Sequence, residues 1–298
     1  MTMKKLVLFV FMLSVIVACG PGKRAIQATQ NTPSVTTTTD TVTPTDEPVD
    51  VAPTETTQED KDTSPKEEVI KPKDDAVDTP IETMEAFDHT SWNTLLSNYV
   101  SEAGNVDYKG FKTEWASLRN YLATLSENMP AGNWTGEDKL AYWMNAYNAM
   151  TVDLILRNYP LTSIKDIKDP WKQRFWKLGE KWYNLDEIEH QILRKMDEPR
   201  IHFGINCASF SCPPLLNEAF TRQDVDDQLE RLAVTFVNDP KRNTISENSV
   251  KISKIFSWFA RDFKQDGSVI DFLNKYSEVT INPKAKKSFR DYDWSLNE

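Results

Sequence analysis

The chain of 298 residues lacks several signatures of common functions. Only 9 residues are glycine, and they form no glycine-rich loop that could cradle nucleotide phosphates. There is no Cys-x-x-Cys pair and no His-Glu-x-x-His sequence, so no standard zinc signature is present. Acidic residues outnumber basic ones by 45 to 35, and the resulting net charge of −10 argues against a nucleic-acid partner. We therefore predict no cofactor, no metal and no nucleic-acid ligand.

Long apolar runs are also scarce, and the one at the N-terminus is typical of a secretion signal. Residues 6–17 are apolar and follow Lys4 and Lys5, but the run is too short for a comfortable membrane span. The next residues, Val17-Ala18-Cys19-Gly20, resemble a bacterial lipobox. We expect residues 1–18 to be a lipoprotein signal peptide and Cys19 to carry the lipid anchor. The alternative is a soluble secreted protein cut at an Ala-x-Ala-like site.

Aromatic residues are absent from the next stretch of the chain. Residues 19–84 are rich in Thr, Pro, Asp and Glu, and such a composition cannot bury enough surface to order the chain. We predict a disordered tether there and one globular domain over residues 85–298, which holds all 9 Trp and all 9 Tyr. Because Gly20 follows the lipidated cysteine, analogy with enterobacterial sorting favours the outer membrane, with the domain facing the periplasm.

Within this domain the hydrophobic periodicity predicts more helix than strand. We expect helices over residues 87–99, 111–126, 138–158, 185–194, 224–238 and 268–276. A hairpin is expected around Gly179-Glu180, a strand over 201–206, and two short strands over 243–246 and 249–252. The sequence therefore predicts an α+β fold, a single helix-rich domain around a small, mainly antiparallel sheet.

The expected strand 201–206 leads into two thiols, Cys207 and Cys212, and an acid–imidazole pair, Glu189-His190, lies shortly before it. These side chains are the components of a cysteine nucleophile site. In that interpretation Cys207 is the nucleophile and His190 its base, which Glu189 would orient. Adjacent residues on a helix project about 100° apart, so Glu189 and His190 cannot simply bond each other there.

Three further residues have two interpretations each. Asn145 could orient the histidine, or its amide could bridge backbone groups of neighbouring loops. Asn206, or nearby backbone N–H groups, could stabilise an oxyanion. His202 is most simply a hydrogen-bonded core residue and is otherwise an alternative base. The two thiols could also pair in an oxidising compartment, which would leave a non-catalytic peptide- or glycan-binding module with a disulfide or inert thiols.

Four motifs in order resemble the family called domain of unknown function 547: Ala141-Tyr-Trp-Met-Asn-Ala-Tyr-Asn-Ala-Met150, Ile188-Glu-His-Gln-Ile-Leu-Arg194, the stretch from Arg200 through both thiols to Leu215, and Tyr292-Asp-Trp-Ser-Leu-Asn297. The resemblance spans residues 90 to 298 and implies that Glu189, His190 and Cys207 lie on signature motifs. The family brings no settled activity. A weaker similarity to papain-like and transglutaminase-like cysteine enzymes in permuted order agrees with His190 preceding the thiols.

From these observations we expect a membrane-tethered envelope lipoprotein. Its domain would act as a cysteine-dependent acyl-transfer or peptidase-like enzyme on envelope peptides. Its expected partners are the membrane, through the lipid on Cys19, and a peptide or cell-wall ligand. The alternative is the non-catalytic binding module.

Overall fold

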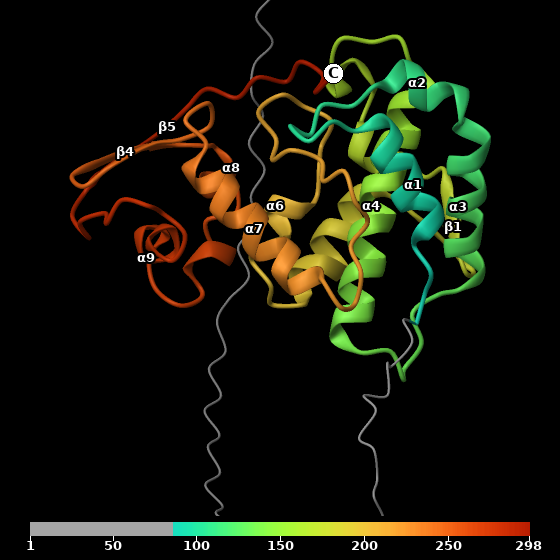
Figure 1. Cartoon of the computed structure of the whole chain (residues 1–298), viewed down its shortest axis with the longest axis horizontal. Coiled ribbons are helices and arrows are strands. Elements are labelled where there is room, and N and C mark those ends of the chain that lie inside the picture. The colour runs from blue at the N-terminus through green and yellow to red at the C-terminus, as the bar shows by residue number, and fades with distance from the viewer. Residues whose placement is uncertain (1–85) are drawn as a thin grey trace, which may run out of the picture. The chain divides into compact units, whose positions relative to one another are not determined.

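The computed structural model describes residues 86–298, so the predicted signal peptide, the predicted lipidation site Cys19 and the predicted tether lie outside the described residues. The described part is a single α+β domain in which helices predominate (Figure 1). None of its helices combines the length and apolar character needed to cross a bilayer. The longer helices are α1 (Thr90–Tyr99), α2 (Tyr108–Thr113), α3 (Trp115–Glu127), α4 (Gly136–Asn158), α7 (Val225–Asn238) and α9 (Val269–Asn274).

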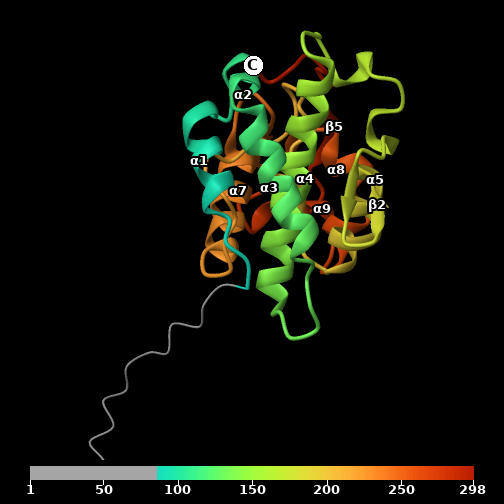
Figure 2. The ribbon, with the colours of Figure 1, turned by 90° about the vertical axis from the view of Figure 1, so that its right-hand side faces the viewer.

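Helix α4 forms the centre of the domain, with α3 packed along it (Figure 2). It begins with a capping box, in which Thr135 Oγ1 accepts from the backbone N–H of Asp138 and Asp138 accepts from the backbone N–H of Thr135. Every residue from 140 to 156 is buried, so other elements cover the helix on all sides. The predicted helix 138–158 is confirmed.

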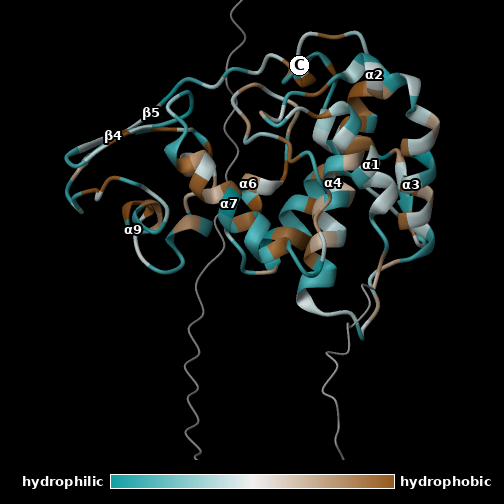
Figure 3. Ribbon diagram, in the orientation of Figure 1, coloured by the Kyte–Doolittle hydropathy of each residue, from teal (hydrophilic) through white to brown (hydrophobic). Residues whose placement is uncertain are grey.

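Two hydrophobic clusters make up the core. The first surrounds α1 to α4, and the second is formed by the end of α7 together with β4 (Ser249–Ile252), α8 (Ile255–Trp258) and α9. Helix α7 joins the clusters, because Leu229 packs in the first and Phe236 in the second. In Figure 3, α9 is largely apolar whereas α7 carries both polar and apolar residues, as expected for a helix with one exposed face.

The strands form two small sheets. Strands β1 (Trp176–Leu178) and β2 (Lys181–Tyr183) pair antiparallel around Gly179, whose φ of 55° suits glycine at a tight turn. Strand β3 (Thr244–Ser246) is antiparallel to β4, and β5 (Lys286–Phe289) pairs with β4 in parallel. The predicted hairpin, the two predicted short strands and the α+β class are confirmed, with one sheet mixed rather than antiparallel.

The predicted strand 201–206 is wrong, because residues Ile201–Gly204 form a short helix, α6. All of residues 201–206 are buried, so an alternation of apolar and small residues does not separate a strand from a helical turn here. Tertiary packing decides the conformation. A side chain at Gly204 would lie 2.1 Å from Met144 Cε, and the Gly204 carbonyl accepts a hydrogen bond of 2.9 Å from Asn148.

Two other predicted elements differ in detail. The predicted helix 111–126 is two helices, α2 and α3, because the backbone leaves the helical conformation at Glu114. The predicted helix 185–194 is helical throughout but uneven. It starts as a turn of α-helix (α5, Leu185–Glu187), continues as a π-helical turn (Ile188–Ile192) and ends as a 3₁₀ turn (Leu193–Lys195). Single π-helical turns are frequent at functional sites.

Residues 291–297, which we call the C-terminal strap, run back from β5 to α2 across the domain (Figure 1). The strap is tied to three distant segments by backbone hydrogen bonds: Phe210 N–H donates to Ser295 O, Leu296 N–H donates to Thr162 O and Val106 N–H donates to Asn297 O. These bonds bring the end of the chain against residues 207–212.

Candidate active site

A cavity of about 590 Å³ lies where the two hydrophobic clusters meet, and we call it the thiol cavity. Its wall combines α4, residues 165–172, the π-helical turn, residues 205–213, α8 and the C-terminal strap. Of the predicted site residues, it is lined by Glu189, His190, His202, Cys207 and Cys212. Asn145 and Asn206 are not on its wall.

Residues 207–212, the thiol turn, are held in place by amide side chains behind them. Asn206 Oδ1 accepts from the backbone N–H of Ala208 at 2.7 Å, and Asn206 Nδ2 donates to Pro213 O at 2.8 Å. Asn148 Oδ1 in turn accepts from the backbone N–H of Asn206 at 2.9 Å. Ala208 has a φ of 56°, which this bonding holds in the left-handed region. Asn206 therefore shapes the turn from behind and does not line the cavity in which an oxyanion would form.

The Cys207 sulfur is surrounded by hydrogen-bond donors. Its Sγ lies 3.1 Å from Ser209 Oγ and 3.2 Å from Tyr292 OH of the strap. The Cys212 thiol, together with these hydroxyls and the Ser209 backbone N–H, stabilises the thiolate and lowers the pKa of Cys207 to about 7, although burial opposes the shift. Close to half of the Cys207 side chains are therefore ionised at neutral pH.

Cys212 behaves differently, although it lies on the same turn. It is buried, and burial raises its pKa well above the ordinary value, so it stays a thiol. Its Sγ accepts from the Cys207 backbone N–H at 3.0 Å. Both cysteines are free, so the disulfide alternative is wrong for this structure. The Cys212 sulfur accepts from the Cys207 backbone N–H, and its thiol interacts with the Cys207 sulfur through a hydrogen bond and not a covalent bond.

Glu189 is the second titratable group in the cavity. Its carboxylate is buried on the π-helical turn and accepts a hydrogen bond of 3.1 Å from Tyr147 OH of α4. Burial raises its pKa to about 7 against the favourable charge of His190, and the nearby Cys207 thiolate adds to the rise. A carboxyl and a thiol that both titrate near neutral pH in one cavity are suited to proton transfer.

His190 lines the cavity, but it makes no hydrogen bond with the thiol among the described residues. Its Nδ1 lies 3.0 Å from Arg194 Nη1, and its Nε2 lies 3.7 Å from Asp186 Oδ1. Because a guanidinium only donates, Nδ1 is the acceptor in the contact with Arg194.

His202 supports the wall of the cavity. Its Nε2 lies 2.8 Å from Asp262 Oδ2, and its ring stacks on Phe259 with centroids 3.9 Å apart. Asp262 also receives two hydrogen bonds from Arg194, and these partners keep its pKa well below the ordinary value even though burial acts in the other direction. Burial lowers the pKa of His202. The structure thus gives His202 the hydrogen-bonded core position that the sequence favoured.

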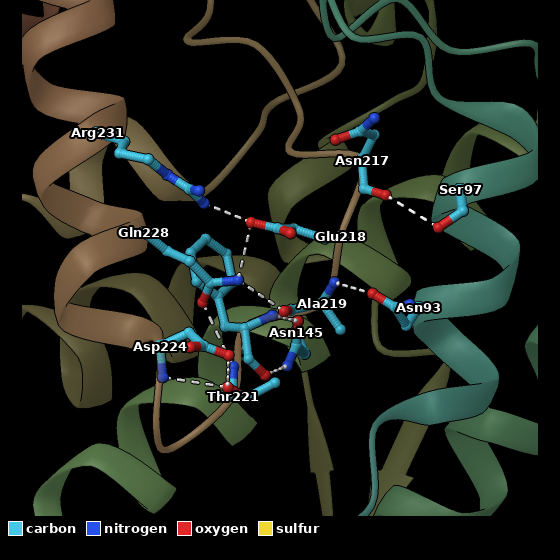
Figure 4. Close-up of polar contacts among 11 residues, drawn as sticks. Asn93, Ser97, Asn145, Asn217, Glu218, Ala219, Thr221, Asp224, Gln228 and Arg231 are labelled. Carbon is cyan, nitrogen blue, oxygen red and sulfur yellow. Dashed lines mark hydrogen bonds and ion pairs between the residues drawn. The ribbon is translucent and has the colours of Figure 1, made fainter.

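Asn145 is also committed to the fold. Its Nδ2 donates to Phe220 O at 2.8 Å and its Oδ1 accepts from the Phe220 backbone N–H at 3.0 Å. Figure 4 shows Asn145 beside the segment from Asn217 to Thr221, where Gln228 of α7 adds further contacts. Asn145 therefore bridges backbone groups of a neighbouring loop and does not reach the histidine.

Sequence reasoning missed three residues of the site: Tyr147, Ser209 and Tyr292. Tyr147 and Tyr292 each lie in one of the quoted motifs, but both looked like core aromatics because nothing in the sequence shows where a phenol hydroxyl points. Elsewhere, the third imidazole of the domain, His89, pairs with Tyr121 OH at 2.7 Å. Residues 86–298 contain no group of three or more His, Cys, Asp or Glu side chains that could hold a metal ion.

The geometry thus places a cysteine of lowered pKa on the wall of an aromatic-lined cavity. Residues 131–237 match the model of a family described as "Protein of unknown function, DUF547". The match is narrower than the resemblance over residues 90 to 298 suggested: it includes α4, the π-helical turn and the thiol turn, but not the strap. No curated protein matches the chain, and no solved structure does. The papain- or transglutaminase-like arrangement therefore stays a prediction.

Proposed function

We propose that the domain is a thiol-dependent acyl-transfer enzyme, a hydrolase or a transferase, with Cys207 as its nucleophile. The observation that carries the proposal is the setting of Cys207: its sulfur is held by the hydroxyls of Ser209 and Tyr292 on the wall of a cavity that also contains the protonatable Glu189. A structural cysteine needs neither a cavity nor a stabilised thiolate.

In this reaction the Cys207 thiolate attacks the carbonyl carbon of an amide or ester and forms a C–S bond. The bond to the leaving amine or alcohol breaks, and the leaving group takes a proton from a group in the cavity. The resulting thioester is then attacked by water or by an acceptor amine, which restores the thiolate and returns the proton. No oxidant, reductant or bound metal is required.

We assign that proton to Glu189, which lines the same cavity as Cys207. Burial raises its pKa to about 7, so its carboxyl can both hold and release a proton near neutral pH. His190 is held by Arg194 on one side and faces Asp186 on the other. We assign Glu189 as the acid–base group and His190 as a polar residue of the cavity wall beside it.

The cavity favours a substrate with an apolar or aromatic group next to the reacting bond. Trp171, Trp258, Phe259 and Trp294 line it, and its volume of about 590 Å³ is in the range of small-molecule and short-peptide sites. Such a cavity suits envelope peptides as substrates. The lipobox-like residues around Cys19 support the other part of the proposal, an envelope lipoprotein in the outer membrane that faces the periplasm.

The test uses an activated peptide ester and the reduced full-length chain. We expect acylation of Cys207, detected by peptide mass spectrometry, and release of the leaving group in the absorbance signal. Cys207→Ser should abolish both signals. Cys212→Ser keeps the nucleophile and should still be acylated at Cys207, more slowly at neutral pH because the Cys212 thiol no longer stabilises the thiolate. Acylation of Cys212 instead, or none at saturating ester, would contradict the proposal.

A non-catalytic binding module is the second candidate, and the aromatic wall is the observation that favours it. Trp258 is 48% exposed and stacks with Trp294 at 5.9 Å between ring centroids, a surface on which a sugar ring or an aromatic side chain could lie. In that case Cys207→Ser would leave ligand affinity unchanged, while Trp258→Ala would remove it.

The proposed location has its own test. Because the lipid would be attached at Cys19, Cys19→Ala should release the protein from membranes or stall its maturation. Membrane retention of the Cys19→Ala protein, with normal maturation, would exclude lipid anchoring.

A further inference from the structure

A second, smaller cavity of about 250 Å³ shares one lining residue, Tyr292, with the thiol cavity. We call it the cationic pocket. Four basic residues line it, Lys241, Arg242, Lys251 and Arg290, together with the hydroxyl-bearing Ser211 and Ser253. The basic residues come from three parts of the chain: the turn after α7, strand β4 and the residue that follows β5.

The pocket is positively charged in a protein whose net charge is −10. Arg242 pairs with Asp239 at 2.8 Å, and Asp291 contributes one carboxylate to the lining. Among residues 86–298, Lys241, Lys251 and Arg290 form no ion pair. Asp239 and Asp291 offset part of this charge, and the remaining basic residues leave a positive excess that an anion would compensate.

The two arginines of the pocket are fixed by the backbone. Arg242 donates to Phe210 O at 2.7 Å and to Cys212 O at 3.2 Å, which ties the pocket to the thiol turn. Arg290 donates to Pro240 O at 2.9 Å and to Thr244 Oγ1 at 2.6 Å. The Nε of Arg290 is buried and has no hydrogen-bond partner among the described residues. An unsatisfied buried donor on a charged group is costly.

We propose that the cationic pocket binds an oxyanion, a phosphate or carboxylate group. Such a group would compensate the basic cluster and accept hydrogen bonds from Lys241, Lys251 and a serine hydroxyl. It would lie beside Ser211, whose Oγ accepts from the backbone N–H of Asp293 at 2.9 Å. The hydroxyl proton of Ser211 can therefore point to an anion. The inference goes beyond acyl transfer and does not depend on it.

The experiment is calorimetric titration of the full-length chain at low ionic strength with three probes: inorganic phosphate, acetate and glycerol 3-phosphate. We expect saturable binding of at least one of them that weakens as salt is added. The double variant Lys241→Ala/Lys251→Ala should bind it about tenfold more weakly, since two partly exposed ion pairs of up to about 1 kcal/mol each are lost. Both lysines are exposed, so the variant should fold.

The matched control is Lys284→Ala/Lys287→Ala, which removes the same charge from exposed positions that do not line the pocket. It should bind like the unmodified chain. Preference for glycerol 3-phosphate over phosphate would indicate a group carried on a larger ligand, and the opposite preference a free ion. Absence of saturable binding by all three probes, or equal weakening in both double variants, would overturn the proposal. None of these readouts depends on the Cys207 thiol.

Discussion

Replacing Tyr292 with Phe removes one hydroxyl from the thiol site and leaves the ring in place. That hydroxyl lies 3.2 Å from Cys207 Sγ and 3.1 Å from Ser209 Oγ. A hydrogen bond to a charged group contributes about 1.5–3 kcal/mol, and about 1.4 kcal/mol corresponds to a change of one in pKa. Because Ser209 and Cys212 keep their bonds to the sulfur, we expect the lower part of this range. The pKa of Cys207 should rise from about 7 to about 8.

The assay follows alkylation of reduced protein by iodoacetamide between pH 5 and 10, with peptide mass spectrometry to separate Cys207 from Cys212. The rate should follow the thiolate fraction, so its midpoint reports the pKa. Tyr276→Phe is the matched control, since Tyr276 packs against Phe272 in the second hydrophobic cluster. Its midpoint should equal that of the unmodified protein.

Two results would refute the reasoning. If the midpoint for Cys207 in the unmodified chain is that of an ordinary cysteine, the donors around the sulfur do not stabilise a thiolate. If the midpoint stays near 7 in a folded Tyr292→Phe protein, the strap hydroxyl is not one of those donors. In either case the role of the strap in the site would have to be abandoned.

Three further predictions concern stability. The pKa of Glu189 is raised to about 7, so ionisation of its carboxyl disfavours the folded state. The unfolding free energy should therefore fall by about 3 kcal/mol as pH rises from 4.5 to above 7. Glu189→Gln should remove this loss in urea unfolding curves, and a pH profile that the variant leaves unchanged would contradict the prediction. Asn148→Ala leaves the Gly204 carbonyl and the Asn206 N–H buried without hydrogen-bond partners. The unfolding free energy should fall by about 2–5 kcal/mol in the same assay. A fall of less than about 1 kcal/mol would show that water replaces the amide. Thr135→Ala removes the cap of α4 and should lower the unfolding free energy by about 1 kcal/mol, with Thr135→Ser as the control that keeps it.

Local sequence patterns were sufficient to predict a helix or strand wherever one face of the element meets solvent or a capping residue lies at its end. The β1–β2 hairpin followed from its turn residues, and α7 from apolar residues at helical spacing. The pattern failed at Ile201–Gly204, where every side is buried and the alternation has no solvent face to refer to. It also missed the break at Glu114, which depends on how α2 and α3 pack and not on a breaker residue.

By itself the sequence determined the class of the fold, the course of α4 and the short list that contained Cys207 and Glu189. Tertiary structure decided which of those residues share a cavity, because hydrogen bonds between distant segments bring them together. Tyr292 reaches Cys207 across 85 positions of the chain, and Tyr147 reaches Glu189 across 42. The same contacts set the pKa values of the thiol and the carboxyl, which depend on burial and on neighbouring groups. Residue types can be read in order along a chain, but burial and the direction of a hydroxyl exist only once the chain has folded.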